Sequence, residues 1–547
     1  MIARTAQHAA HAAEAYRRGL WVDTTLADAL RTAATESPRR TLLVDKDIRL
    51  NCATLYSQAE ALAGALLARI PTASTVSFML PNWHESAVIY LAATLAGMVV
   101  NPILPSLRDH DLRLILEDAG SAMLFVPQSY GGHDYVAMLQ RVTSEMDRPP
   151  EVVVLRGPET DQTGSHTPYR ALLQRPPGPA ALPTLDPDSV RMILYTSGTT
   201  SRPKGVLHTH NSLHALICQI REHWTVAPGD TFLVPSPVAH IGGSIYAFEC
   251  PLLLGTTAVL MDRWDAAEAV TLMNSHRCTH MAGATPFLQQ LLSAAERAET
   301  RLPDLKVFIC GGASVSPSLI RRAAAYFDRS VVTRVYGCTE VPVATVGAPR
   351  PEEADYAADT DGRPGIADIK LAAHEAAPAG DGEICVRGPQ MLLGYRHPED
   401  DSFDAAGFFR TGDLGRWVDD NYLVVTGRTK DVIIRSGENI SAKEVEDLLA
   451  DHPGIAEIAV VGLPDERTGE RACAVIVPAG GERPDVASLL ALLVSKGVAK
   501  FKAPEQVLLW NALPKNDAGK ILKHQIRATL MRGEAGRGGA PRGAKDG

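Results

Sequence analysis

The chain has 547 residues, more than one hydrophobic core usually holds, so we expect two or more domains. Hydrophobic residues make up 45% of the sequence and charged residues 21%, which is ordinary for a soluble globular protein. The formal net charge of -9 argues against a general nucleic-acid-binding protein, which would carry a basic stripe.

Cysteine usage and the first residues indicate the compartment. The eight cysteines are scattered and form no CxxC pair, so we expect reduced core thiols and no zinc site or disulfide framework. The first residues lack the charged start and apolar block of a signal peptide, and no apolar run approaches the length of a membrane span. The sequence therefore predicts a cytoplasmic protein with no membrane segment.

The N-terminal part alternates between helical and strand periodicity after a surface helix in the first ~20 residues. Helices are predicted over 25–34, 52–70, 85–97 and 109–118, and strands over 41–44, 48–50, 75–80, 98–104 and 122–126. This alternation predicts a parallel sheet covered on both faces. Residues 157–189 are rich in Gly, Pro, Thr and Asp and are predicted to form a loop or linker.

A second α/β unit is predicted next, and the pattern then changes. Helices are expected over 211–224 and 266–275, strands over 231–235, 258–261 and 307–310, and a buried apolar segment over 244–254. From 382 onwards the segments are short and β-like, at 383–387, 415–418 and 423–426.

The last part reads as a compact α/β domain of roughly 100 residues. Ser441 and Glu444 form a capping box that begins a helix, and strands at 455–462 and 471–478 and a helix at 486–494 follow. We therefore expect an N-terminal domain over 1–429, a C-terminal domain over 430–531 and a disordered Gly- and Arg-rich tail over 532–547. The fold class is α/β, with stacked α/β sheets and a β-rich subdomain in the large domain, and a small mobile α/β domain at the C-terminus.

The most informative stretch is Tyr195-Thr-Ser-Gly-Thr-Thr-Ser-Arg-Pro-Lys-Gly205. It follows an apolar strand at 190–194, and its small residues, hydroxyls and lysine can all turn towards one anion. Successive backbone N–H groups form a concave anion site, so phosphate is the expected ligand. The spacing is not that of a Walker A loop, and the competing interpretation is a flexible surface linker.

Five further stretches carry residues suited to binding or catalysis. They are Gly311-Gly-Ala313, Tyr336-Gly-Cys-Thr-Glu340, Thr411-Gly-Asp413, the segment 427–439 and Pro514-Lys-Asn-Asp-Ala-Gly-Lys520. The first two follow predicted strands, where parallel sheets bind ligands, and the third places a lone carboxylate after a glycine turn. Each has a plain alternative: a turn, a turn with a buried tyrosine, or a solvated lysine.

Three histidines, His208, His210 and His214, suggest a metal site, but no carboxylate or cysteine has matching spacing. We expect them to be structural or to line a pocket. A basic cluster at Lys496, Lys500 and Lys502 would suit the phosphates of a ligand, and a solvated face is an equal alternative.

In this order and at these separations, the six stretches resemble the acyl-adenylate-forming superfamily, which includes acyl-CoA synthetases, luciferases and the adenylation domains of peptide synthetases. The resemblance runs from about residue 21 to 527. Pro237-Val-Ala-His-Ile-Gly-Gly243 and Gly437-Glu-Asn-Ile-Ser-Ala-Lys443 are most similar to bacterial ligases for medium-chain or alicyclic acids, of the cyclohexanecarboxylate type.

The resemblance implies an ATP-dependent acid–CoA ligase that forms an acyl-AMP intermediate. The residues implied to bind the β- and γ-phosphates of ATP are Thr196, Ser197, Gly198, Thr199, Thr200 and Lys204. Those implied to frame the adenine are Gly311, Gly312, Ala313, Tyr336 and Gly337. Asp413 and Arg428 would hold the ribose, Thr339 the α-phosphate, Glu340 with Thr199 the Mg²⁺, and Lys520 would bridge the acid and the phosphate.

The resemblance also implies an acyl pocket and a moving domain. The implied pocket residues are His240, Ile241, Gly242, Gly243, Gly283 and Val341, and their small size suggests room for a bulky or cyclic acid. The C-terminal domain would turn about Lys430 between the two half-reactions and bring the Gly437 segment over the acyl-AMP, beside a tunnel for the pantetheine arm of CoA.

One departure keeps a second mode of action open. The family's phosphate loop usually has glycine where this chain has Ser201, and a serine there would strain a positive φ or crowd a phosphate. The enzyme would then not use ATP itself. It would transfer the acyl group to CoA from an acyl-adenylate that an upstream adenylating enzyme supplies.

Two further classes of protein fit the same residues. One is a stand-alone adenylation enzyme that loads a carrier protein in place of CoA, and the other is a scaffold that holds a nucleotide without turnover. The expected partners are a small carboxylic acid, CoA and a second copy of the chain as a homodimer.

Overall fold

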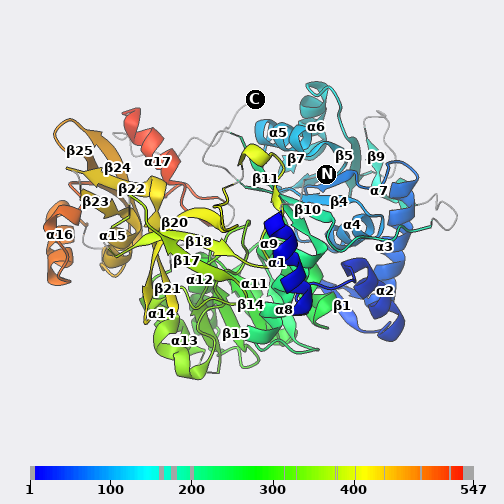
Figure 1. The fold of residues 1–547 in the computed structure, drawn as a ribbon, viewed down its shortest axis with the longest axis horizontal. Helices are drawn as coiled ribbons and strands as arrows, with labels where there is room; N and C mark the ends of the chain where they lie inside the picture. Colours follow the sequence, from blue (N-terminus) through cyan, green and yellow to red (C-terminus); the bar gives the residue numbers. More distant parts are fainter. Residues whose placement is uncertain are drawn as a thin grey trace.

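The computed structural model describes residues 6–158, 166–173, 181–196, 202–312, 315–327, 329–375, 377–378, 380–400, 402–436, 438–480, 483–516 and 519–533. It is a mixed α/β structure with a large N-terminal part and a smaller C-terminal part, which lies at the left of Figure 1. The predicted fold class is confirmed in this respect. No helix in the described residues has the length and apolar character needed to span a membrane.

Two large sheets form the N-terminal part. The first has eight strands in the order β19-β11-β10-β4-β3-β5-β8-β9, and the second has seven in the order β16-β15-β14-β12-β13-β1-β2. The strands of the first are β3 (Thr75–Phe78), β4 (Val99–Pro102), β5 (Ser121–Pro127), β8 (Glu151–Leu155), β9 (Thr167–Pro168), β10 (Val190–Thr196), β11 (Lys204–Thr209) and β19 (Gly394–Tyr395). Those of the second are β1 (Thr41–Asp45), β2 (Ile48–Asn51), β12 (Thr231–Val234), β13 (Thr257–Leu260), β14 (His280–Gly283), β15 (Val307–Cys310) and β16 (Val331–Arg334).

Most neighbouring strands in these sheets are parallel, and helices connect and cover them (Figure 1). Strands buried on both faces are apolar throughout, as all four residues of β15 are. The helices are α1 (Ala6–Arg17), α2 (Leu26–Glu36), α3 (Cys52–Leu67), α4 (His84–Leu95), α5 (Asp109–Ala119), α6 (Tyr135–Ser144), α7 (Tyr169–Leu173), α8 (His210–His223), α9 (Ile241–Ser244), α10 (Cys250–Leu253), α11 (Ala266–Ser275), α12 (Thr285–Arg297), α13 (Pro317–Tyr326) and α14 (Ala354–Asp359). A π-helical turn, η1 (Ile245–Glu249), joins α9 to α10, and a small hairpin is formed by β6 (Ser129–Tyr130) and β7 (His133–Asp134).

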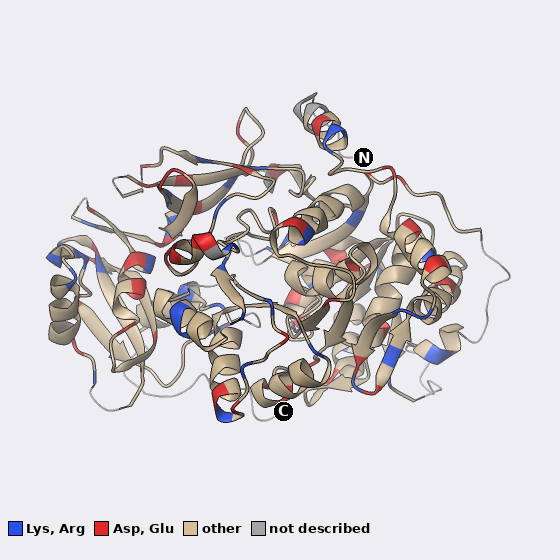
Figure 2. Ribbon diagram, turned by 90° about the horizontal axis from the view of Figure 1, so that it is seen from below, with Lys and Arg blue, Asp and Glu red and all other residues tan. Residues whose placement is uncertain are grey.

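The two remaining sheets lie towards the C-terminus. An antiparallel sheet of β17 (Asp368–Ala372), β18 (Gly382–Arg387), β20 (Phe409–Val418) and β21 (Tyr422–Arg428) lies between the large sheets and the C-terminal part (Figure 1). The C-terminal sheet contains β22 (Val432–Arg435), β23 (Glu438–Ser441), β24 (Ile455–Asp465), β25 (Gly469–Pro478) and β26 (Gln506–Leu509). Its helices are α15 (Ala442–Leu449), α16 (Val486–Ser495) and α17 (Lys523–Met531). Basic and acidic residues are interspersed over the whole ribbon (Figure 2).

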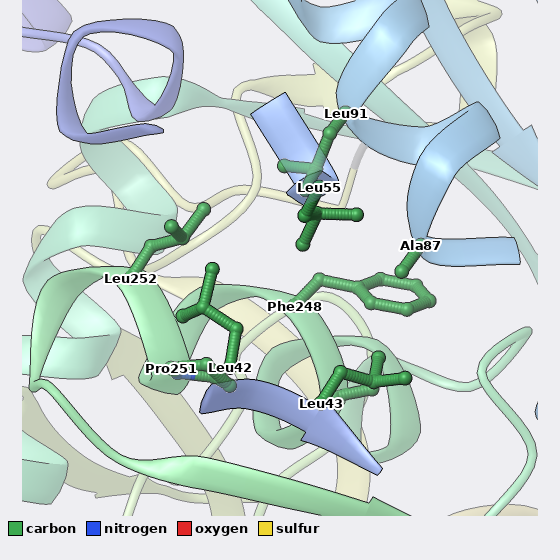
Figure 3. Close-up of a pocket in the computed structure, with 9 residues that line it drawn as sticks. Leu42, Leu43, Leu55, Ala87, Leu91, Phe248, Pro251 and Leu252 are labelled. Carbon is green, nitrogen blue, oxygen red and sulfur yellow. The ribbon is translucent and has the colours of Figure 1, made fainter. Parts of the chain in front are cut away.

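The core of the N-terminal part is closely packed. Between β1, α3, α4 and α10 there is a cavity of about 10 Å³, lined by Leu42, Leu55, Leu91 and Phe248 among others (Figure 3). A void of this size with apolar walls is a packing defect and does not hold a ligand.

One buried polar cluster anchors the start of β10. The carboxylate of Glu249 accepts hydrogen bonds from the Tyr90 hydroxyl at 2.5 Å and from Arg191 Nη2 at 2.7 Å. Arg191 and Glu249 each expose only 1% of their side chains. An isolated charge at this depth is strongly unfavourable, so the pairing fixes both partners and with them the strand that leads to the phosphate stretch.

Two predictions of local structure, for residues 157–189 and for the turn at Gly412, are corrected. Residues 157–189 contain β9 and α7 as well as loop, because Leu172 is buried and the Tyr169 ring packs edge-on against Phe125. The segment around Gly412 is no turn: it lies inside β20, where Gly412 has φ +71°. The strand register shifts just beyond it, so the glycine supplies the backbone conformation of an irregular strand.

The capping box at α15 is half formed. The Ser441 hydroxyl accepts a hydrogen bond from the Glu444 backbone N–H at 3.1 Å, as predicted. The Glu444 carboxylate binds Lys502 Nζ at 2.8 Å instead of the Ser441 backbone, because the lysine offers a full charge. The predicted disordered tail lies almost wholly outside the described residues.

Candidate active site

The carboxyl ends of β14, β15 and β16 lie side by side. Gly283 pairs in register with Cys310, and Cys310 with Arg334, so the residues that follow these strands meet at one edge of the seven-stranded sheet. Ligands of parallel α/β sheets bind beyond this edge. The predicted residues Gly311 and Tyr336 follow Cys310 and Arg334 closely along the chain and therefore lie there.

The glycines after β15 have two different roles. A Cβ atom on Gly311 would lie 2.9 Å from Val335 Cγ2 and 3.0 Å from the Val335 oxygen, so this backbone packs against the segment after β16. Gly312 has φ +81°, and no other atom would lie within 4 Å of its Cβ. The turn therefore leaves an open face of backbone next to the strand ends. Ala313 lies outside the described residues.

Asp413 and Tyr336, both buried, and the partly exposed Arg428 form a polar group at the same edge. The Tyr336 hydroxyl donates to Asp413 Oδ2 at 2.8 Å, and Arg428 Nε lies 2.8 Å from Asp413 Oδ1. Asp413 on β20 is opposite Arg428 on β21 in the strand register, and its exposure is only 5%. Burial, and then the charge of Asp413, raise the pKa of the Tyr336 hydroxyl well above its usual value, so the phenol stays protonated and donates.

The loop after Tyr336 places Thr339 and Glu340 at the edge of the first sheet. The Tyr395 hydroxyl donates to Glu340 Oε1 at 2.7 Å, and His208 Nε2 lies 2.8 Å from the Thr339 carbonyl oxygen. Burial lowers the pKa of His208 to about 4, so the ring is neutral and Nε2 donates to this carbonyl. A Cβ on Gly337 would lie 2.6 Å from the Val343 nitrogen, so only glycine fits the loop there.

The phosphate stretch is described only at its two ends. Thr196 on β10 pairs in register with Lys204 on β11, and Lys204 Nζ lies 5.2 Å from the centre of the Tyr395 ring. The predicted residues Ser197, Gly198, Thr199 and Thr200, and the unusual Ser201, lie outside the described residues. The two strands thus deliver both ends of the stretch to the side of Glu340.

Lys520 comes from the C-terminal part and reaches this site. A Cβ on the preceding Gly519 would lie 3.1 Å from Pro286 Cγ at the start of α12, so the turn contacts the N-terminal part. Burial, and then the charges of Arg428 and Lys430, lower the pKa of Lys520 to about 8, while Asp413 opposes this effect. The structure therefore brings Lys520 into electrostatic contact with the Asp413–Arg428 pair.

Lys430 lies in a short turn, η4 (Thr429–Asp431), between the last strand of one sheet and the first of the next. Burial, and then the Arg428 charge, lower the pKa of Lys430. Gly437, which lies between β22 and β23, is outside the described residues.

Close contacts with neighbouring residues hold two of the glycines that were predicted to line the acyl pocket. A Cβ on Gly243 would lie 2.0 Å from the Pro237 oxygen, and a Cβ on Gly283 would lie 2.6 Å from Phe287 Cδ2. At these two positions the space that a Cβ would take is already filled by neighbouring atoms, so packing requires glycine there. The expectation of room for a bulky acid stays a prediction. Around Gly242, the nearest atom to an added Cβ would be Tyr246 Cε2 at 3.9 Å, so this position is open.

His240 and Ile241 begin α9 beside these glycines, and Val341 is fully buried next to Tyr336. Burial lowers the pKa of His240, so its ring is neutral. Its Nε2 is buried and makes no hydrogen bond in the described structure.

Sequence reasoning missed Tyr395 and Phe287. Tyr395 belongs to a two-residue strand, too short for a periodic signal, and Phe287 is an ordinary apolar residue of α12. The Gly394-Tyr395 pair before a proline-containing turn was the one available hint.

In the basic cluster of Lys496, Lys500 and Lys502, two of the three lysines bond other groups of the same domain. Lys502 Nζ pairs with Glu444, and Lys496 Nζ donates to the Leu448 carbonyl oxygen at 2.7 Å. These contacts favour a structural and solvated face over a site for CoA.

The histidine metal interpretation is not supported by the contacts. His208 bonds the Thr339 carbonyl, and His214 Nδ1 lies 3.0 Å from the Leu20 carbonyl oxygen. Within the described ranges, three potential metal ligands gather at Asp45, His84 and Glu85. Arg156 Nη2 lies 2.8 Å from Glu85 there, so a guanidinium already provides the positive charge.

The cysteines are free thiols, as predicted, and six of the eight are buried. Burial raises the pKa of several of them, Cys310 to about 12 among them, which leaves these thiols protonated and unreactive.

Comparison with known proteins agrees with this geometry. Residues 30–396 match the AMP-binding enzyme family, and residues 444–520 match the AMP-binding enzyme C-terminal domain. The medium-chain fatty-acid–CoA ligase of Escherichia coli strain K12 is 34% identical, over 95% of this chain and 93% of that protein. A salicylyl-CoA synthase / salicylate adenylyltransferase of a Streptomyces species is 31% identical, over 96% of this chain and 97% of that protein.

Solved structures show the same fold over nearly the whole chain. The o-succinylbenzoate CoA synthetase of Bacillus subtilis, in complex with its acyl-adenylate intermediate, has a TM-score of 0.78 and 25% identity, and covers 91% of this chain and 97% of its own. ATP-bound MatB from Rhodopseudomonas palustris has a TM-score of 0.81 and 25% identity, and covers 93% of this chain and 99% of its own. The chain therefore belongs to the AMP-binding enzyme family, within the acyl-adenylate-forming superfamily, and it is an ATP-dependent, AMP-forming acid–CoA ligase.

Proposed function

We propose that this enzyme activates a carboxylic acid of the medium-chain, alicyclic or aromatic class with ATP and transfers the acyl group to CoA. The names of two relatives, the medium-chain fatty-acid–CoA ligase and the salicylyl-CoA synthase, support acids of this size.

In the first half-reaction, a carboxylate oxygen of the acid attacks the α-phosphorus of ATP and pyrophosphate leaves. Gly311 and Gly312 present backbone to the adenine, and the Asp413 carboxylate, held by Tyr336 and Arg428, accepts from the ribose hydroxyls. Thr339 contacts the α-phosphate, and the stretch from Thr196 to Lys204 holds the β- and γ-phosphates. The Lys520 ammonium binds the attacking carboxylate and the α-phosphate together, which positions them and neutralises charge.

Glu340 fits a role as a magnesium ligand. Its carboxylate is half-buried and supplies the oxygen donors that Mg²⁺ prefers, with one oxygen already oriented by Tyr395. The ion, when bound with ATP, neutralises phosphate charge. Thr199 is the second proposed ligand.

In the second half-reaction, the thiolate of CoA attacks the acyl carbon, the bond to AMP breaks and the thioester forms. The acyl-AMP is already activated, so no protein nucleophile is needed, in agreement with the buried protonated thiols. We infer that the C-terminal part turns about Lys430 between the half-reactions and brings the Gly437 segment to the acyl-AMP. The position of Lys430, in a short turn between two sheets, supports this hinge.

The observation that carries the proposal is the Asp413–Arg428 ion pair of 2.8 Å, whose charges shift the pKa of Lys520. The turn before Lys520 contacts Pro286 just beyond β14, and Tyr336, just beyond β16, bonds Asp413. These contacts support a cation between the proposed ribose and phosphate sites.

The test is pyrophosphate exchange with a panel of octanoate, cyclohexanecarboxylate, benzoate and salicylate, followed by thioester detection with CoA. We expect acid-dependent exchange and a matching acyl-CoA. Transfer to CoA from synthetic acyl-AMP, without exchange for any acid of the panel, would overturn ATP use and support the transfer-only enzyme that Ser201 suggests.

A carrier-protein acceptor is a second candidate. Two relatives, 2,3-dihydroxybenzoate-AMP ligase (29% identical) and Triostin synthetase I (31% identical), have names that do not include CoA, which is compatible with another acceptor. The occupied charges of Lys496 and Lys502 also weaken the case for a CoA phosphate site on that face. Faster transfer to a holo carrier protein than to CoA, measured side by side, would decide for it.

A further inference from the structure

We propose that Tyr395 is a positioning residue that joins the phosphate-binding lysine to the magnesium-binding carboxylate. Its hydroxyl orients Glu340, and the face of its ring holds Lys204. The inference rests on the proposed function, because it takes from it the roles of these two residues.

The sheet register explains why the ring lies under Lys204. Tyr395 on β19 is opposite Val206 on β11, at the edge of the eight-stranded sheet. Lys204 is two residues before Val206, so it points to the same face and is a diagonal neighbour of Tyr395. Lys204 Nζ accordingly lies 5.2 Å from the ring centre, within the range of a cation–π interaction.

The hydroxyl end of the same side chain reaches Glu340. It donates to Glu340 Oε1 at 2.7 Å, while Tyr395 itself is only 6% exposed. The backbone is fixed too, since the Leu392 N–H donates to the Glu340 carbonyl oxygen at 2.7 Å. The segment before Tyr395 and its side chain thus hold both the main chain and the carboxylate of Glu340.

Tyr395 has rigid support of its own. Its ring packs against Phe409 on β20, with the ring centres 6.3 Å apart. A stiff aromatic side chain with two rotatable bonds transmits a displacement from one end to the other better than a flexible one. Lys204, on β11, and Glu340, in the loop after β16, are therefore held in one fixed relation by Tyr395 on β19.

Two variants separate the two contacts. Tyr395→Phe keeps the ring under Lys204 and removes the bond to Glu340, whereas Tyr395→Leu removes both. Loss of a group that orients a metal ligand costs roughly 10- to 100-fold in metal affinity. We expect Tyr395→Phe to weaken metal binding about tenfold with little change in the KM for ATP, and Tyr395→Leu to raise that KM as well.

The measurement is titration of the enzyme with Mn²⁺ by electron paramagnetic resonance, in the presence of a non-hydrolysable ATP analogue. Pyrophosphate exchange as a function of Mg²⁺ concentration gives the second readout. The matched control is Tyr422→Phe, which removes a buried tyrosine–carboxylate bond to Glu353 of 3.2 Å at the far end of β21. The control should leave both readouts unchanged, and the melting temperature of each variant establishes that it is folded.

Glu340→Gln distinguishes the possible failures. If it weakens Mn²⁺ binding and Tyr395→Phe does not, the positioning role is wrong while the proposed function stands. If neither variant changes Mn²⁺ binding, the magnesium assignment of Glu340 is wrong, and the inference falls with it. Weakening by both variants, with an unchanged KM for ATP in Tyr395→Phe, supports the inference.

Discussion

The proposed nucleotide side and the proposed acyl side of the site are stabilised by different kinds of contact. On the nucleotide side, both oxygens of Asp413 have named partners, Tyr336 and Arg428, and Glu340 is bonded to Tyr395. On the acyl side, the glycines at 243 and 283 are determined by contact with Pro237 and Phe287. Recognition of the nucleotide thus depends on a few polar residues that belong to sequence motifs. The shape of the acyl pocket depends on packing neighbours, such as Phe287, that belong to no motif.

The largest effect is expected from Lys520→Ala, which removes the cation from the nucleotide side. Removal of one electrostatic stabiliser of a transition state costs about 10²- to 10³-fold in rate, and we expect this loss in pyrophosphate exchange. Transfer from synthetic acyl-AMP to CoA should be nearly unchanged. Lys515→Ala is the control. Lys515 lies in the same segment as Lys520, but its ammonium pairs with Glu457 on β24. Equal losses in both half-reactions would contradict the division of roles.

Asp413→Asn should come next. The change weakens hydrogen bonds to a charged group, worth about 1.5–3 kcal/mol each, so the KM for ATP should rise ~10- to 100-fold. Asp368→Asn is the control in the same sheet, where an exposed carboxylate pairs with Arg387. Steady-state kinetics at saturating acid gives the answer, and an unchanged KM in Asp413→Asn would remove Asp413 from the ribose site.

On the acyl side, Gly242 and Gly243 should respond differently to added bulk. Gly242→Val fills open space, so we expect about a tenfold loss for the longest accepted acid with an unchanged KM for ATP. Gly243→Ala places a Cβ against the Pro237 oxygen and should lower the melting temperature instead. If both variants change only the selectivity for acids and leave the melting temperature unchanged, the structural role of Gly243 is wrong.

The smallest effect is a pH dependence. Because the pKa of Lys520 is lowered to about 8, its cation is present below this pH and is lost as pH rises through it. Between pH 7 and 8.5, kcat/KM for exchange should fall about fourfold, as for a single group that must stay protonated. In Lys520→Arg the fall should disappear, since guanidinium stays charged. A persisting fall would assign it to another group.

Much of the fold follows from periodicity. The predicted helix over 266–275 and strand over 307–310 have the bounds observed for α11 and β15, because each is a clear apolar pattern between polar residues. The irregular strand around Gly412 was predicted as a turn, since a glycine with positive φ gives the same local signal in either place. Only the pairing of β20 with β18 and β21 distinguishes the two.

The site was predictable where the chemistry belongs to a motif. Asp413, Tyr336 and Lys520 each have an ordinary alternative on their own, and only the ordered set of motifs singled them out. Tyr336 bonds Asp413, and the Asp413 charge influences the pKa of Lys520. Tyr395 could not be found in this way, because its contact with Glu340 is set by the pairing of an edge strand far along the chain. Phe287 was missed for a related reason: its effect on the pocket depends on the rotation of α12 against Gly283.

The charge of Arg428 influences the pKa of Lys520, although the whole C-terminal sheet lies between the two residues in the chain. The segment from Arg428 to Lys520 is thus a long loop whose two ends lie in the proposed site. If this segment were unfolded, its ends would rarely come together. Folding of the C-terminal sheet supplies this closure. The adenylation rate should therefore depend on whether the C-terminal sheet is folded. On heating, adenylation should be lost as soon as the C-terminal sheet unfolds, even while the N-terminal sheets are intact.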